Sequence, residues 1–348
     1  MRFPEFFGNQ AVAETLSEMI SAGRIPQTIL LSGPEGIGKA TLARRFAAAL
    51  LGDARKIERD DLSLPHNLET LSDREKWPAD KRAEDPLLFG SHPDFLTFPP
   101  DGPLRQLSIQ QMRLLRERAP FKPLQGSRRV FLIDHLNRAN EQAANSLLKV
   151  LEEPPDHLII IATAENSYDL LPTIRSRSIL LQMARLSDDD MRAFAAARRL
   201  PEAETRIAVA EGSPGLAAGI DLEEFRERRD FLLCAFECGA GVSSWASWVQ
   251  RSESFGMRKS EKLELYLKPA YSMLEDILST AQSCGIVRNR DVHGRIEAIA
   301  QRVSFDWIEA AIRALDELVL MVRRNIQKLS ALDAMIIILR NRLQYAST

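Results

Sequence analysis

Residues 33–40 have the spacing of a phosphate-binding loop. The segment is Gly33-Pro-Glu-Gly-Ile-Gly-Lys39-Ala40, which matches the pattern G-x-x-x-x-G-K. Glycines at Gly33, Gly36 and Gly38 let the backbone turn its N–H groups inward around phosphate oxygens, and Lys39 would reach the terminal phosphates. An apolar run precedes the loop and a helical pattern follows it, which is the context the motif requires. We therefore expect these three glycines and Lys39 to bind phosphate.

The metal-binding half of this site is incomplete. The position after the lysine normally supplies a hydroxyl that ligates Mg²⁺, and here it is Ala40. Thr41 offers a hydroxyl one residue later, where the helix has turned by about 100°. Asp134 ends the apolar run RVFLID, at the place of the acidic residue that orients the metal. The next residue is His135, where nucleotide-hydrolysing enzymes with such a loop carry a glutamate that acts on the attacking water. Both defects affect one chemical step, so we expect little or no hydrolysis.

Two interpretations of the loop stay open. One is a site for ATP or ADP with weak support for Mg²⁺, using Thr41 and Asp134, and the other is a retained loop that binds nothing. His135 is interpreted as structural, because an imidazole differs from a carboxylate in reach and pKa. We assign no metal ligands, since His66 and His92 alone do not make a metal site and Cys234 and Cys238 fit buried thiols. With Cys284, the cysteines form an odd, sparse set that fits a reducing cytoplasm.

Apolar runs alternate with helical patterns around these residues. The runs lie at 28–32, 95–98, 129–134, 158–164 and 179–183, and the helical patterns at 10–22, 41–52, 109–119 and 141–153. This alternation predicts an α/β domain over residues 1–184, with helices on both faces of a parallel sheet. Ser108 and Asn140 are the expected caps of two of its helices. Residues 53–90 are polar and punctuated by proline, which predicts an irregular or partly mobile insertion.

Strand signals almost disappear after residue 184. Helical patterns lie at 187–199, 203–211, 221–236, 261–280, 293–303 and 306–344, and we expect the last to form two packed helices. We predict a small helical domain at 185–219 and an all-helical domain at 220–348. The net charge of -2 excludes DNA binding by the charge of the whole molecule. The sequence has no expected signal peptide or membrane span, which favours the cytoplasm.

Several segments resemble one protein family. Residues 145–155, NSLLKVLEEPP, resemble a helix of bacterial clamp-loader subunits, and residues 162–178, ATAENSYDLLPTIRSRS, resemble their sensor-1 strand and Ser-Arg-Cys segment. The start of the chain through GPEGIGK, SHPDF at 91–95 and EGSPGLA at 211–217 resemble the same proteins. Over roughly 1–217 the chain is thus similar to AAA+ clamp-loader subunits of bacterial DNA polymerase III, above all to the delta-prime group.

The resemblance implies an AAA+ P-loop domain of three layers, a helical lid and an all-α collar. It also implies a hetero-pentamer that opens a sliding clamp and places it on primer–template DNA, without sequence-specific recognition. Ser176-Arg177-Ser178 matches Ser-Arg-Cys, so Arg177 is the expected arginine finger for the nucleotide of a neighbouring subunit, with Arg175 as competitor. By the same resemblance, Arg113 lies where such subunits face the duplex, and a solvated helix face explains its charge equally well. Residues 40–100 lack the cysteines of the family's zinc module, so zinc is not expected.

Three functions fit the sequence. The first is a loader subunit that does not hydrolyse ATP and supplies Arg177 in trans. The second is an active AAA+ ATPase, either a loader motor subunit or a stand-alone remodeller, in which Thr41 or water replaces the missing metal ligand. The third is a scaffold without nucleotide. We favour the first, because the substitutions at Ala40 and His135 occur beside an intact arginine motif.

Overall fold

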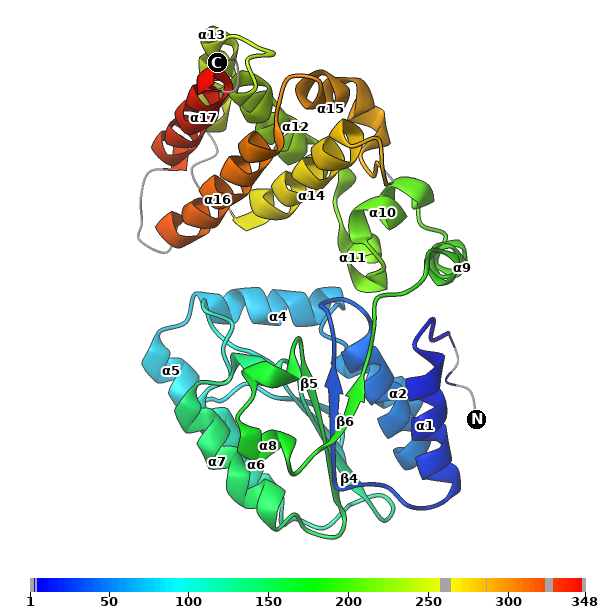
Figure 1. Ribbon diagram of the computed structural model, residues 1–348. Helices are drawn as coiled ribbons and strands as arrows, with labels where there is room; N and C mark the ends of the chain where they lie inside the picture. The colour runs from blue at the N-terminus through cyan, green and yellow to red at the C-terminus, as the bar shows by residue number, and fades with distance from the viewer. Residues whose placement is uncertain (1–2, 4, 257–263, 286, 323–327, 346–348) are drawn as a thin grey trace. The chain divides into compact units, whose positions relative to one another are not determined.

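The computed structural model describes residues 3, 5–256, 264–285, 287–322 and 328–345. The chain divides into two compact units, Met1–Ala218 and Gly219–Thr348. The first unit is built on a six-stranded, mostly parallel sheet, and the second is helical (Figure 1). This is the fold class that the sequence predicts.

The sheet has the strand order β2-β3-β4-β5-β1-β6. Its strands are β1 (Thr28–Ser32), β2 (Phe89–His92), β3 (Phe95–Phe98), β4 (Arg129–Ile133), β5 (Leu158–Ala164) and β6 (Ile179–Gln182). The five strands predicted from apolar runs are all present, and they pair in parallel. The sheet departs from the predicted parallel arrangement at one edge, where β2 pairs with β3 in the antiparallel sense.

Helices cover both faces of the sheet, because successive strand residues point to opposite sides. On β1, Ile29 and Leu31 pack with one core cluster and Leu30 with the other. The helices of the first face are α1 (Gln10–Ser21) and α2 (Lys39–Leu51), and those of the second are α6 (Ile109–Arg118), α7 (Glu141–Glu152) and α8 (Pro172–Arg175) (Figure 1). Ser108 and Asn140 cap α6 and α7 as predicted.

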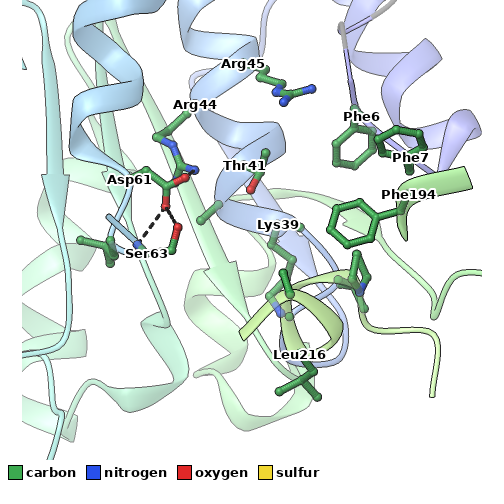
Figure 2. A pocket seen from close by; sticks show the side chains of 18 of the residues that line it. Phe6, Phe7, Lys39, Thr41, Arg44, Arg45, Asp61, Ser63, Phe194 and Leu216 are labelled. Atoms are coloured by element: carbon green, nitrogen blue, oxygen red, sulfur yellow. Dashed lines mark hydrogen bonds and ion pairs between the residues drawn. The ribbon is translucent and has the colours of Figure 1, made fainter. Parts of the chain in front are cut away.

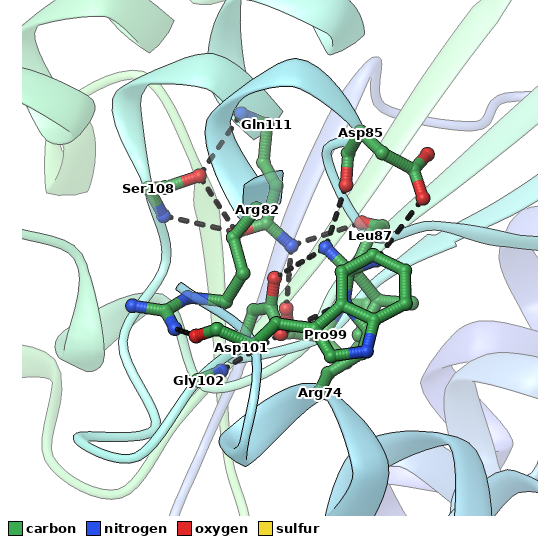
Figure 3. Close-up of polar contacts among 10 residues, drawn as sticks. Arg74, Arg82, Asp85, Leu87, Pro99, Asp101, Gly102, Ser108 and Gln111 are labelled. Atoms are coloured by element: carbon green, nitrogen blue, oxygen red, sulfur yellow. Dashed lines mark hydrogen bonds and ion pairs between the residues drawn. The ribbon is translucent and has the colours of Figure 1, made fainter. Parts of the chain in front are cut away.

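The prediction of an irregular insertion at 53–90 is wrong. Its elements are α3 (Ala54–Ile57), η1 (Glu58–Asp60), α4 (Pro65–Glu75), α5 (Ala79–Glu84) and then β2. Arg74 of α4 is buried and binds both carboxylate oxygens of Asp101, at 3.0 and 2.8 Å, and the main-chain oxygen of Asp85, at 2.6 Å (Figure 3). Buried Asn67 donates to the main-chain oxygens of Arg59 and Asp61. Polar side chains thus fold this segment, with little help from an apolar stripe.

Residues 185–218 add three helices to the first unit. They are α9 (Asp188–Arg198), α10 (Ala203–Ala210) and α11 (Pro214–Gly219). These helices share a small core of their own, which includes Leu186, Met191, Ile207 and Ala217. The predicted domain boundaries after residues 184 and 219 stay predictions. The division into two compact units falls between residues 218 and 219.

The second unit packs its helices around two buried tryptophans, Trp248 and Trp307. Its helices are α12 (Leu222–Gly239), α13 (Trp245–Gly256), α14 (Glu264–Ala281), η4 (Arg290–Val292), α15 (His293–Ala300), α16 (Phe305–Val322) and α17 (Lys328–Tyr345). The pattern at 306–344 forms two helices that pack together, as predicted, whereas α13 was not predicted. Residues 261–263 of the pattern at 261–280 lie outside the described residues.

Burial raises the pKa of the Cys234 and Cys238 thiols on α12, which fits their interpretation as structural thiols. Within the described ranges, no three His, Cys, Asp or Glu side chains are grouped to hold a metal ion. None of the helices in those ranges is both long and apolar enough to span a membrane.

Candidate functional site

The phosphate loop connects β1 to α2 and is packed on both sides. A β-carbon at Gly33 would lie 2.3 Å from the main-chain oxygen of Met183, which follows β6, so only glycine fits there. On the other side, Gly215 N donates to Gly36 O at 2.8 Å, and Ser213 Oγ donates to Glu35 O at 3.0 Å. The start of α11 therefore fixes the tip of the loop.

Lys39 begins α2 and turns its ammonium group back onto the loop. Its Nζ donates to Gly33 O at 2.7 Å and to Pro34 O at 2.6 Å. The side chain is buried, which lowers its pKa, while the carboxylates of Asp134, Glu165 and others oppose that shift. A phosphate at this site would compete with two carbonyl oxygens for the lysine.

Asp134 and His135 lie directly after β4, next to the end of β5. Thr163 of β5 donates its hydroxyl to Asp134 Oδ1 at 2.6 Å and accepts the main-chain N–H of His135 at 2.8 Å. The imidazole of His135 lies 4.0 Å from Asp134 Oδ2 and 3.5 Å from Glu165 Oε1. Thr163 was not predicted as a site residue, although its place at the end of a strand parallel to β4 could have indicated it.

A cavity of about 670 Å³ brings most of the predicted residues together (Figure 2). Gly36, Gly38, Lys39, Thr41 and Asp134 line it, whereas Gly33 does not. Three aromatic side chains, Phe6, Phe7 and Phe194, lie together at one side of the cavity, and three residues of the insertion that carry polar side chains, Glu58, Asp61 and Ser63, line it as well.

The residues of this cavity do not fit a magnesium-bound nucleotide. Ala40 supplies no oxygen at the position where the motif needs a metal ligand. Asp134 remains, but its Oδ1 already accepts the Thr163 hydroxyl, and a single carboxylate is a poor site for an ion that demands near-octahedral oxygen coordination. The glycines and Lys39 fit a phosphate group better than its metal.

Arg177 lies at the amino end of β6, at the opposite end of the strands from the phosphate loop. Strands β1 and β6 run parallel, with Ile29 beside Ile179. Ile29 stands four residues before Gly33, which is about 13 Å at about 3.3 Å per strand residue. Arg177 lies in the turn that precedes Ile179, and so at the far end of this distance. Arg177 therefore cannot reach phosphates bound by its own chain.

The guanidinium of Arg177 is held at the surface. Nη1 donates to Thr173 O at 3.0 Å, and Nη2 lies 3.0 Å from Glu152 Oε1 at the end of α7. The Arg177 side chain is 36% exposed. Arg175 is more buried, and its guanidinium stacks on the ring of Tyr168 at 4.8 Å. Of the two candidates, Arg177 is the more exposed.

Comparisons with known proteins give a consistent set of relatives. A sequence model of the family described as "DNA polymerase III, delta subunit" matches residues 79–187. The DNA polymerase III subunit gamma/tau of Mycobacterium tuberculosis is 31% identical over 194 residues, which are 56% of this chain and 30% of that protein. The DNA polymerase III subunit delta' of Pseudomonas aeruginosa is 30% identical over 205 residues, which are 58% of this chain and 57% of that protein.

Among solved structures, a DNA polymerase III gamma-subunit-related protein from Thermotoga maritima aligns with a TM-score of 0.46 at 16% identity, over 94% of this chain and 99% of that one. The sequence matches are confined to part of each protein. The chain spans less than a third of the length of the gamma/tau relative and just over half the length of the delta' relative.

Proposed function

We propose that this chain is a subunit of the clamp-loader family of bacterial DNA polymerase III, of the delta-prime type, and that it hydrolyses no ATP itself. In this proposal it presents Arg177 to the nucleotide of a neighbouring subunit. A guanidinium stays charged at all working pH values and donates in a fixed fork to phosphate oxygens. Such an arginine stabilises the charge that develops in phosphoryl transfer.

The observation that carries this proposal is the separation of two sites across one sheet. The phosphate loop follows the carboxyl end of β1, and Arg177 precedes the amino end of β6. Its own loop is more than about 13 Å away, from the rise of about 3.3 Å per strand residue, which supports a role of Arg177 at the active site of another chain. Ala40, which supplies no metal ligand, supports the proposal that the chain's own site hydrolyses no ATP.

The partners in this proposal are the other subunits of a hetero-pentameric loader, a sliding clamp and primer–template DNA. The helical second unit would serve as the collar through which the subunits assemble. Arg113 is exposed on α6, as a contact to the DNA backbone requires. Contacts to phosphates fix position and carry no sequence information, and the complex would act in the cytoplasm.

Reconstitution with candidate loader subunits tests the proposal. We would measure ATP turnover with clamp and primed DNA for the wild type, Arg177→Ala and the matched control Arg175→Ala. An arginine finger contributes about 10³–10⁵-fold at the site it serves, so Arg177→Ala should lower turnover at least about tenfold in a complex that has several sites. Assembly, measured by gel filtration, should stay intact. Unchanged turnover in Arg177→Ala, or ATP hydrolysis by the purified chain, would refute the proposal.

A further inference from the structure

Part of the insertion, residues 58 and 61–64, lines the cavity beside the phosphate loop and forms a charged wall of it. Arg44 points from α2 into this wall, where its Nε lies 3.0 Å from Glu58 Oε2 and its Nη2 lies 2.5 Å from Asp61 Oδ2. Asp61 also accepts the main-chain N–H and the hydroxyl of Ser63, which lines the same cavity (Figure 2). Arg44 is thus a cation about one and a half turns after Lys39 on the same helix, and these two partners are carboxylates of the chain itself.

Buried polar contacts hold this wall in place. Asn67 is 3% exposed and donates to Arg59 O at 2.7 Å and Asp61 O at 2.8 Å. Asp60 is 1% exposed and accepts the main-chain N–H of Ser91 in β2. Because Asp60 and the main-chain oxygen of Asp61 are held in this way, the Asp61 carboxylate faces Arg44 as a built feature of the fold.

The charges around the cavity oppose a polyphosphate. Five carboxylates line it, from Glu5, Glu35, Glu58, Asp61 and Asp134, against four cationic side chains, from Lys39, Arg44, Arg45 and Arg198. Arg44 is neutralised by the insertion, and Lys39 is turned onto the loop carbonyls. A nucleoside triphosphate without Mg²⁺ would bring its full negative charge next to Glu58 and Asp61, and like charges this close repel.

We propose that Glu58 and Asp61 determine the anion selectivity of this pocket by excluding nucleoside triphosphates. They do so by occupying Arg44 and by placing negative charge along the cavity. The proposal concerns the chain's own pocket and does not depend on the trans role of Arg177. It assigns the insertion a function, namely to keep a serviceable phosphate loop free of ATP.

Equilibrium binding of ATP to the purified full chain tests this assignment. The variant Glu58→Gln/Asp61→Asn keeps the size of both side chains but removes their charge, and it leaves Arg44 free for a phosphate. We expect it to bind ATP at least about tenfold more tightly than the wild type in EDTA, with a gain that shrinks as salt is added, because the effect is electrostatic. The matched control Asp73→Asn removes an exposed carboxylate of α4 that pairs with Lys76 away from the cavity, and its affinity should equal that of the wild type.

A third variant measures how much of the gain in ATP affinity depends on Arg44. Adding Arg44→Gln to Glu58→Gln/Asp61→Asn should remove most of the gain, since the freed guanidinium is then lost and only the relief of the negative charge remains. Circular dichroism verifies folding, and Asp61→Asn alone, with a smaller gain expected, replaces the double variant if that one unfolds. Equal affinity of wild type and charge variants, or a gain in the triple variant as large as in the double variant, would overturn the selectivity proposal and leave Arg177 untouched. Loss of turnover in Arg177→Ala is a separate measurement on the assembled complex.

Discussion

The buried ion pair of Arg74 and Asp101 should hold the insertion on the sheet domain. Arg74 binds Asp101 through two hydrogen bonds, and the two side chains are only 5% and 7% exposed. Arg74→Met keeps much of the apolar stem but leaves the carboxylate of Asp101 buried without its cation. Removing one partner of a buried pair costs about 3–5 kcal/mol, so we expect a loss of that order.

Hydrogen exchange measured by mass spectrometry can localise this loss. Residues 65–75 form α4, and their amides should exchange about 10²- to 4 × 10³-fold faster in Arg74→Met, because each 1.4 kcal/mol corresponds to about a factor of ten. The matched control is Arg105→Met, which breaks a pair with Glu75 at 2.7 Å whose side chains are 39% and 33% exposed. A pair this exposed contributes less than about 1 kcal/mol, so the control should exchange almost like the wild type.

Two outcomes would contradict this reasoning. Equal exchange in Arg74→Met and Arg105→Met would mean that burial of the pair adds nothing to its strength. Faster exchange spread evenly over β1, β4 and β5 would mean that the insertion has no separate opening and that the pair stabilises the whole unit. Only faster exchange centred on the insertion supports the prediction that the Arg74–Asp101 pair holds α4 to the turn at Asp101.

Two further predictions concern groups outside the Arg74–Asp101 pair. Burial and a 2.5 Å hydrogen bond to Asp316 raise the pKa of Tyr271 to about 12. The folded state therefore keeps the phenol proton longer than the unfolded chain, and this contribution to stability is lost as pH rises from about 10 to about 12. Ultraviolet titration of the phenolate should show a lower pKa in Asp316→Asn, and Tyr271→Phe should remove this part of the pH dependence of unfolding. Glu152→Ala should cost less than about 1 kcal/mol in urea unfolding, since its pair with Arg177 is half-exposed; a fall in complex turnover, rescued by Glu152→Gln, would show that Glu152 positions the arginine.

The strands could be predicted where their environment is uniform. Residues 28–32, 95–98 and 158–164 are buried along their whole length, and a continuous apolar run reports that burial directly. Strand β2, Phe89–His92, is FGSH, and two of its four residues are exposed. Its strand conformation comes from pairing with β3, which a local pattern does not contain.

The insertion could not be predicted for a related reason. Helix α4 has the sequence PHNLETLSDRE, and its buried side chains include the polar residues Asn67 and Arg74. A search for apolar periodicity treats both residues as surface. They are buried because Asp101 and the main chain near Asp61 satisfy them, and those partners are distant in the sequence or lie in a turn.

The residues of the candidate site also differ in whether a local sequence pattern could identify them. Lys39 and Asp134 could be found by spacing, because a loop and a strand end fix them locally. Thr163 and the Arg44 cluster could not, since each depends on a contact between separate elements. Arg177 came from the resemblance, and the register of β6 on β1 then added that its own loop is out of reach.

A phosphate loop that lacks its metal ligand still has a structural role in this fold. Gly36 O accepts the N–H of Gly215, and Gly33 lies against the main chain that follows β6. Lys39 ties the loop together through two of its carbonyls. Alanine at position 40 supplies no oxygen for a metal ion, while these contacts of the loop come from Gly33, Gly36 and Lys39. Arg177 lies at the opposite end of the strands from the loop, so the proposed loss of hydrolysis would leave the arginine in place, and the subunit could still complete the site of another, as we propose.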